Sequence, residues 1–208
     1  MKKMYDVTMT INENIVVYKD KVEKKPVFTV ASSKKAGDST NETYVKFNVH
    51  TGTHMDFARH VQDDGVTSKG FDVTTFLRTA RVLDLTNVTG EIKPEHLEKF
   101  NIAAGETIFL KTKNSDEDYF NVEFIFVGYD AAKYLAAKKV FAVGLDALGI
   151  ERDQPGHPTH HTLINHNVWI IEGLRLKEVP EGTYELIALP LKLDDVDGTP
   201  LTVVLKEM

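Results

Sequence analysis

The sequence predicts a single α/β domain built around a mixed β-sheet. The 208 residues are 42% hydrophobic and 27% charged, which is the composition of an ordinary globular protein. Short β-rich runs separated by polar residues or glycine outnumber the helical patterns. No repeat, low-complexity segment or break in composition divides the chain, so we expect one domain over residues 1–208.

Nine runs rich in β-branched and aromatic residues are the predicted strands. They cover residues 12–18, 44–49, 80–85, 107–111, 124–128, 140–143, 168–171, 184–188 and 201–205. Each run is short and has polar or glycine neighbours, which is typical of strands. The order of these strands in the sheet does not follow from the sequence.

Three segments have the composition of helices. They cover residues 94–100, 130–138 and 159–166. Pro94 suits a first helical turn, where its missing N–H is not needed, and Lys138 suits the negative end of the second helix. Two polar segments are predicted to be surface loops, residues 31–42 and residues 114–120, and the second is a candidate lid.

Composition excludes several classes of protein. The chain has no cysteine, so disulfide scaffolds, thiolate metal sites and cysteine nucleophiles are excluded. A net charge of −6 and a pI near 5.8 do not fit a phosphate-binding surface, so we expect no nucleic-acid partner. No apolar stretch approaches the roughly 18–20 residues of a membrane span, and no apolar signal follows Met1. We therefore expect a cytoplasmic protein that does not bind membranes.

Most of the histidines gather in two short windows. Of the eight histidines, only His96 lies elsewhere. The first window holds His50, His54 and His60, and the second holds His157, His160, His161 and His166. The chain has no Gly-x-Ser-x-Gly elbow, no phosphate-binding glycine loop and no His-Glu-x-x-His motif. Histidine chemistry is therefore the main functional signal of the sequence.

The first window has the donors of a metal site. His50 follows a β-rich run, and Gly52 permits a tight turn that lets His50 and His54 converge. Asp56 adds a carboxylate two residues further on. Two imidazoles and a carboxylate suit Zn²⁺ or Mn²⁺. The alternative is a polar turn whose histidines bind backbone groups.

The second window ends in a carboxylate that follows an apolar run. Glu172 closes the run that begins at Val168, so its side chain is expected to be partly buried. A buried carboxylate needs a compensating positive charge. A metal ion held with a histidine of the second window would supply it, and a salt bridge to Arg175 is the alternative.

Together the two windows offer five candidate ligands, which suit two metal ions that share carboxylates. A two-metal site activates water at neutral pH, so the expected reaction is hydrolysis of an amide, ester or lactone-like bond. His60 lies four residues beyond Asp56. It is a candidate proton shuttle, because an imidazole titrates near neutrality, or else a further ligand or a hydrogen-bond donor to Asp56.

These windows resemble the cyclase-like metal hydrolases, the family of bacterial kynurenine formamidase (arylformamidase) and isatin hydrolase. Residues 50–60 are similar to the family signature His-x-Gly-Thr-His-x-Asp-x-Pro-x-His. Residues 157–163 with 171–174 are similar to its second ligand block, and residues 182–200 to its C-terminal part. The resemblance covers nearly the whole chain.

The resemblance implies roles for individual residues. It implies that His50 and His54 bind one metal ion, that His160 binds a second, and that Asp56 and Glu172 are shared between the two. It further implies that His60 is the general acid/base. His161 is the alternative to His160, because adjacent histidines leave the register open by one residue.

The resemblance also implies a fold, an activity and partners. The fold is a small mixed β-barrel flanked by helices, in a homo-oligomer that is a dimer or tetramer. The activity is hydrolysis of a small-molecule substrate, N-formylkynurenine to kynurenine and formate in tryptophan catabolism, with one or two Zn²⁺ per subunit or Mn²⁺. Two rival functions are hydrolysis or closure of a cyclic amide or lactone such as isatin, and metal binding without catalysis.

The sequence departs from the family pattern at two places. Ala58 stands where the signature has proline, and Tyr18-Lys19-Asp20 stands where the family has an aromatic-Pro-Gly-Asp segment. The changes leave the metal donors in place and affect the substrate pocket. Candidate side chains for stacking on a substrate ring are Tyr18, Phe57 and Phe71, and candidates for pairing with a substrate carboxylate are Lys19, Lys21 and Arg59.

Overall fold

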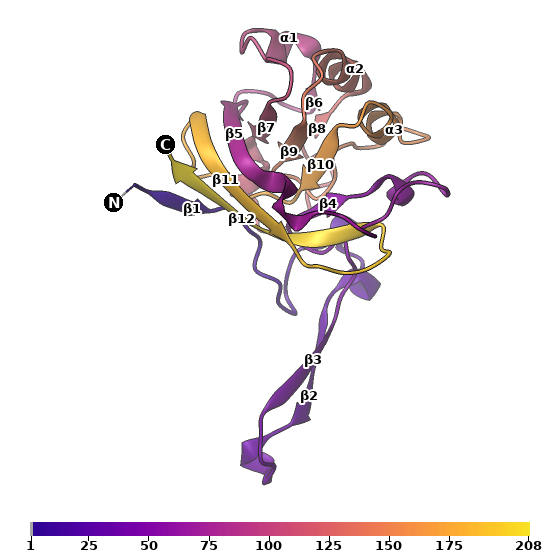
Figure 1. The fold of residues 1–208 in the computed structure, drawn as a ribbon, viewed down its shortest axis with the longest axis vertical. Coiled ribbons are helices and arrows are strands. Elements are labelled where there is room, and N and C mark those ends of the chain that lie inside the picture. Colours follow the sequence, from indigo (N-terminus) through magenta and orange to yellow (C-terminus); the bar gives the residue numbers. More distant parts are fainter. Residues whose placement is uncertain (1) are drawn as a thin grey trace.

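A computed structural model describes residues 2–208 as one mixed α/β unit around a closed β-barrel (Figure 1). The main sheet has the strand order β1-β12-β11-β5-β7-β9-β10-β4, and a further β12–β4 pairing closes seven of these strands into a ring. The strands are β1 Met4–Asp6, β4 His54–Asp56, β5 Leu77–Asp84, β7 Thr107–Lys111, β9 Ala142–Leu145, β10 Trp169–Glu172, β11 Gly182–Pro190 and β12 Gly198–Glu207. The predicted small mixed barrel is thus confirmed.

The barrel is mixed because β5, β7, β9 and β10 run parallel to one another, whereas the pairings that involve β4, β11, β12 and β1 are antiparallel. Side chains alternate between its two faces. Val82 and Phe109 fill the interior, while Leu83 and Leu110 face a second apolar core under the helices. Both cores are fully buried, which fixes the barrel that carries the site.

Three helices flank one side of the barrel (Figure 1). They are α1 Pro94–Glu98, α2 Tyr129–Ala137 and α3 Pro158–Asn165, each within two residues of its predicted bounds. Two short parallel strands, β6 Glu91–Ile92 and β8 Phe126–Val127, lie beside them. Short 3₁₀ turns cover Tyr18–Asp20, Val22–Lys24, Lys34–Ala36, Ala58–His60, Val73–Phe76 and Lys113–Asp116. Within residues 2–208 no helix combines the length and the apolar character needed to cross a membrane.

One prediction of local structure was wrong, and two held only in part. Residues 12–18 form no strand, because Ile15 and Val17 are buried by packing alone and the chain then turns at Tyr18–Asp20. Residues 31–42 are not wholly a loop, since β2 (Val27–Ser32) pairs with β3 (Glu42–Lys46) in a hairpin that projects far from the barrel (Figure 1). Residues 114–120 begin with a 3₁₀ turn whose Asn114 and Ser115 are buried.

Candidate metal centre

Strand β4 carries two of the predicted ligands on one face. His54 and Asp56 are two residues apart, so they point to the same side of the strand, while Met55 between them fills the barrel interior. The register of β4 with β10 places Glu172 directly opposite His54. As a result His54 Nε2 lies 3.3 Å from Glu172 Oε2 and 3.5 Å from Asp56 Oδ1.

Two glycines make room for the first histidine window. Gly52 has a φ of +68°, which a side chain rarely adopts, and this turn brings His50 back over β4. A Cβ on Gly198 would lie 2.5 Å from His50 Cε1, so only glycine leaves space for that ring. The prediction that Gly52 turns the chain to make the two imidazoles converge is confirmed, since the two ring centroids lie 5.0 Å apart.

The first ligand pair contains polar atoms that lack a partner. His54 Nδ1 lies 2.9 Å from the carbonyl oxygen of Gly52 and must donate its proton there, so the lone pair of Nε2 faces the carboxylates. His54 Nε2 and Asp56 Oδ2 are two of only four buried side-chain nitrogen or oxygen atoms in residues 2–208 without a hydrogen bond. Unpaired acceptor atoms in a buried site are typical of a site that binds a ligand.

Helix α3 brings His160 to the same place. Its Nε2 lies 3.6 Å from Asp56 Oδ2 and 3.5 Å from Glu172 Oε1. Its Nδ1 lies 2.5 Å from Glu151 Oε1, so Glu151 fixes the tautomer that leaves Nε2 free. His161 is half-buried, and no hydrogen bond or ion pair within residues 2–208 joins it to the cluster. The geometry therefore favours His160 over His161.

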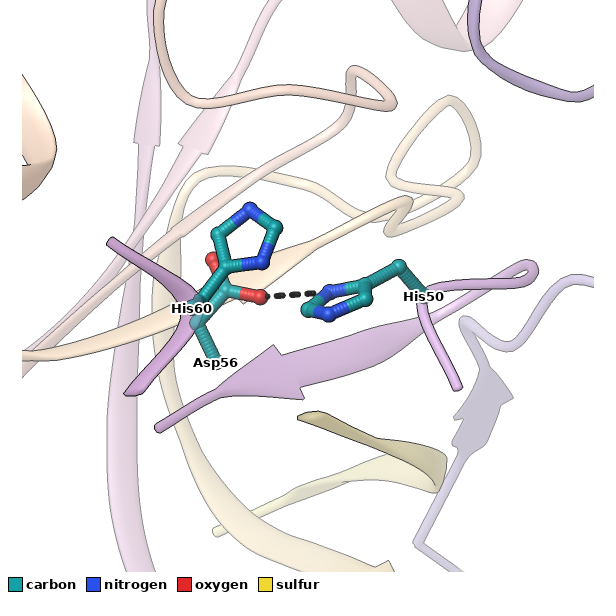
Figure 2. Close-up of side chains that lie close together, drawn as sticks. All are labelled: His50, Asp56 and His60. Carbon is teal, nitrogen blue, oxygen red and sulfur yellow. Dashed lines mark hydrogen bonds and ion pairs between the residues drawn. The ribbon is translucent and has the colours of Figure 1, made fainter. Parts of the chain in front are cut away.

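His50 and His60 also lie beside Asp56 (Figure 2). His50 Nδ1 lies 2.9 Å from Asp56 Oδ1, and its Nε2 lies 2.8 Å from Asp197 Oδ2. His60, from the 3₁₀ turn Ala58–His60, has its ring centroid 4.0 Å from that of His50 and its Nδ1 3.7 Å from Asp197 Oδ2. The carboxylate of Asp197 thus lies beside both imidazoles.

Sequence reasoning missed Asp197 and Glu151 as members of the site. Asp197 lies 147 residues after its partner His50, so no local spacing connects them. The only available signal was its position within the C-terminal part that resembles the family. Glu151 carries no motif at all and is recognised only by its contact with His160.

The buried groups hold charges of both signs. Burial would lower the pKa of His50, but hydrogen bonds with Asp56 and Asp197 raise it to about 9. Burial and the charge of Asp56 would raise the pKa of Glu172, but the imidazoles of His160 and His54 lower it to about 2. Burial lowers the pKa of His60. The carboxylates therefore stay ionised and require positive charge beside them, while His60 stays a neutral base at pH 7.

The donor set fits a divalent cation. The ligand atoms of His54, Asp56 and Glu172 lie within 4.8 Å of one another, and so do those of His50, Asp56 and His60. Imidazole nitrogens and carboxylate oxygens without thiolates suit zinc or manganese. The alternative of a salt bridge from Glu172 is not seen, because Arg175 instead contacts the carbonyl oxygens of Ser115 and Glu117 and the carboxylate of Asp118.

An open pocket of about 720 Å³ leads to the cluster. Tyr18 and Lys19 line it, as predicted for substrate-contacting residues, and Tyr18 packs edge-on against Phe120. The other candidate substrate-contacting residues do not line this pocket. Phe57 and Phe71 pack against Trp169 at the barrel core. Phe57 lies two residues after Met55 and, like it, points into the barrel. Lys21 does not line the pocket, and Arg59 pairs with Asp195.

Comparison with known proteins matches the chain to a cyclase family and to hydrolases with the same fold. The family model "Putative cyclase" matches residues 5–152. Kynurenine formamidase of Bacillus cereus is 31% identical over 203 residues, covering 97% of this chain and 96% of that protein. A solved potential metal-dependent hydrolase with cyclase activity is 45% identical, has a TM-score of 0.93 and is matched over 100% of this chain and 99% of its own. Isatin hydrolase A from Labrenzia aggregata, 21% identical over 98% of this chain and 93% of its own, shares the fold with a TM-score of 0.83.

Proposed function

Because the chain belongs to the cyclase family, we propose that it is a metal-dependent hydrolase of the arylformamidase type. Its substrate is a small aryl formamide, N-formylkynurenine, and its products are kynurenine and formate. The observation that carries the proposal is the pair of orphaned buried atoms, His54 Nε2 and Asp56 Oδ2, in a site open to a pocket. The full-length similarity to kynurenine formamidases supports the substrate class.

The ligands would be shared between two positions. His50 and His54 would hold one ion and His160 the other, and Asp56 and Glu172, which lie close to both groups of histidines, would be shared. A divalent cation bound there polarises the substrate carbonyl and lowers the pKa of water. We infer Zn²⁺, one or two per subunit, with Mn²⁺ as the alternative.

His60 is the residue that moves protons in this proposal. Its side chain is about a third exposed, 34%, so it faces both the cluster and the pocket. The neutral imidazole takes a proton from the attacking water as the water oxygen bonds to the formyl carbon. It returns that proton to the amine nitrogen as the carbon–nitrogen bond breaks. Asp197 Oδ2 lies 3.7 Å from His60 Nδ1, so a carboxylate is near the ring without a hydrogen bond to it.

The chain's own pocket residues orient the substrate. The ring of Tyr18 forms one wall, held by edge-on contacts with Phe120 and Phe124, and it can pack against an aryl ring. Lys19 and Lys24 line the same pocket and can pair with the amino-acid carboxylate of the substrate. The tyrosine therefore retains an aromatic wall where the neighbouring proline and glycine of the family pattern are lost.

The test is turnover of N-formylkynurenine by metal-stripped protein with and without added Zn²⁺ or Mn²⁺. We expect metal-restored kcat/KM above roughly 10⁴ M⁻¹s⁻¹. His60→Ala should keep its metal content and lose about 10²–10⁴-fold in kcat. His166→Ala is the matched control, because His166 is exposed and, among the described residues, its ring hydrogen-bonds only to the carbonyl of Thr162.

Three outcomes would contradict the proposal. Full activity of His60→Ala would remove its role as the acid/base. Metal-dependent turnover of isatin but not of N-formylkynurenine would replace the formamidase assignment with ring opening. Metal binding without turnover of either substrate would leave a metal-binding protein that does not catalyse this reaction.

A further inference from the structure

A strained turn carries Tyr18 into the wall of the metal pocket. The buried side chain of Val17 anchors the chain just before it, and the N–H of Asp20 donates a hydrogen bond to the carbonyl oxygen of Val17. Lys19 and Asp20 have φ values of +58° and +47°, which residues other than glycine rarely adopt. Backbone strain of this kind persists where the surrounding structure holds it, and it is concentrated at functional sites. The turn therefore indicates that the position of Tyr18 has a function.

This turn differs from the one that the family pattern encodes. Lys19 and Asp20 stand where that pattern has proline and glycine. Proline holds φ near −65°, so a proline at position 19 could not adopt the φ of +58°. The departure from the family pattern thus permits the turn that carries Tyr18.

Four side chains lie against the ring of Tyr18. Its centroid lies 5.2 Å from that of Phe120 and 6.4 Å from that of Phe124, both in edge-on geometry. The ammonium nitrogens of Lys19 and Lys24 lie 5.5 Å and 5.3 Å from the same centroid, within the range of cation–π contacts. A ring held in this way keeps its hydroxyl at one place in the pocket.

The hydroxyl end of this ring lies beside the segment that holds two of the proposed ligands. A Cβ on Gly149 would lie 3.2 Å from Tyr18 Cε2, an atom bonded to the carbon that bears the hydroxyl. The residue after Gly149 donates its N–H to Glu172 Oε1 at 2.6 Å, and the next one, Glu151, contacts His160 Nδ1. Glycine at position 149 therefore lets the hydroxyl end of the ring approach the metal cluster.

The Tyr18 hydroxyl is available to a substrate. Burial raises the pKa of Tyr18, and the negative charge of Glu172 raises it further, so the hydroxyl keeps its proton at pH 7. Among residues 2–208 this hydroxyl has no hydrogen-bond partner, whereas that of Tyr184 donates to the carbonyl oxygen of Pro180. A protonated hydroxyl that lines a pocket without an internal partner is a free hydrogen-bond donor.

We propose that Tyr18 is a catalytic residue, whose hydroxyl donates a hydrogen bond to the carbonyl oxygen of the substrate during attack. As the water oxygen bonds to the formyl carbon, the π electron pair of the carbonyl moves to its oxygen, which gains negative charge. A neutral O–H fixed beside that oxygen stabilises this charge more in the transition state than in the bound substrate. The hydroxyl keeps its proton, and the electron pair returns when the carbon–nitrogen bond breaks. This role rests on the proposed hydrolysis of a carbonyl compound.

The test is hydrolysis of N-formylkynurenine by the zinc-loaded wild type and by Tyr18→Phe, which keeps the ring and loses only the hydroxyl. We expect kcat to fall about 10²-fold with little change in KM, because the hydrogen bond strengthens only in the transition state. Affinity for a tetrahedral N-aryl phosphonamidate, measured by calorimetry, should fall in parallel, since its anionic oxygen takes the place of the attacked carbonyl oxygen. Zinc content and the circular dichroism spectrum should match the wild type.

Two further variants separate the hydroxyl from the ring. Tyr18→Leu removes both, so it should raise KM as well as lower kcat, because the contact with the aryl group is also lost. Tyr119→Phe is the matched control, since Tyr119 is 65% exposed and does not line the metal pocket. It should keep both kinetic constants.

Full kcat in Tyr18→Phe beside an active wild type would overturn the role of the hydroxyl and leave the proposed hydrolase intact. So would a loss confined to KM, an unchanged affinity for the phosphonamidate, or an equal loss in Tyr119→Phe. If the wild type hydrolyses isatin instead of N-formylkynurenine, the formamidase assignment fails, and the same variants test the hydroxyl on the isatin carbonyl. A wild type inactive on both substrates would overturn the proposed function and this role together.

Discussion

Two buried aspartates in this molecule are equally hidden from solvent but differ in their partners. Asp146 is 3% exposed and accepts four hydrogen bonds, from Thr112 N and Oγ1, Asn114 Nδ2 and Ser115 Oγ. Asp56 is 2% exposed, and its Oδ2 has no hydrogen bond among the described residues. Hydroxyl and amide donors satisfy the first carboxylate, whereas imidazoles surround the second.

This difference in hydrogen-bond partners shows that burial of a carboxylate does not by itself indicate a functional site. Asp146 ties the segment after β7 to the end of β9, and its donors leave no lone pair for a ligand. The Asp56 cluster instead leaves two acceptor atoms, Asp56 Oδ2 and His54 Nε2, unpaired, which costs free energy that a bound cation would recover. An incomplete polar network is therefore the better indicator of function.

The largest effect is expected from Asp56→Asn. An amide replaces the charge shared between the proposed metal positions. Enzymes typically accelerate reactions by about 10⁶-fold or more, and we expect this variant to lose at least about 10³-fold of that in turnover. Added Zn²⁺ should raise the melting temperature of the wild type, because it binds only the folded state, and should not raise that of the variant. Calorimetry with and without metal checks this. A variant that retains the zinc-dependent shift would remove Asp56 from the ligands.

A smaller effect is expected from Glu151→Gln. Glu151 accepts from His160 Nδ1 and from the backbone N–H of Thr159 at the start of α3, so it orients the imidazole toward the cluster. Loss of its charge should weaken metal affinity about 10–100-fold and leave kcat at saturating metal nearly unchanged. Competition with a chelator measures the affinity.

The matched control for this variant is Glu123→Gln. Glu123 pairs with Arg152 at the surface, and its side chain is 77% exposed. The same chemical change there should leave metal affinity unaltered. Equal affinity of Glu151→Gln and wild type would mean that the Glu151–His160 contact does not position the ligand.

The sequence was most informative about the part of the site whose residues are close together in the chain. The proximity of His50, His54 and Asp56 was predictable because a turn and a three-residue strand bring them together within seven residues. Closure of the barrel was not predictable from periodicity, since β12–β4 pairing joins residues 54–56 to residues 198–200. Asp197 was missed for the same reason, because only tertiary structure brings it to His50.

Apolar character alone misassigned two regions. Ile15 and Val17 have a strand-like composition but are buried by side-chain packing without a partner strand. Phe57 lies beside the ligands in sequence, yet the alternation along β4 and beyond sends it into the barrel. Alternation identifies a face, and only the fold decides what that face contacts.

The smallest effect, and one on stability instead of metal binding, is expected from Asp146→Asn. The amide nitrogen must face either Thr112 N–H or the Asn114 amide, both of which are donors, so one buried donor loses its acceptor. We expect a loss of about 1–3 kcal/mol in the free energy of unfolding, measured by urea denaturation. Activity per folded molecule should stay near that of the wild type, because among the described residues no hydrogen bond joins Asp146 to the proposed ligands. If Asp146→Asn instead kept its stability and lost metal affinity, the distinction between a satisfied structural carboxylate and an incomplete functional one would fail at this pair.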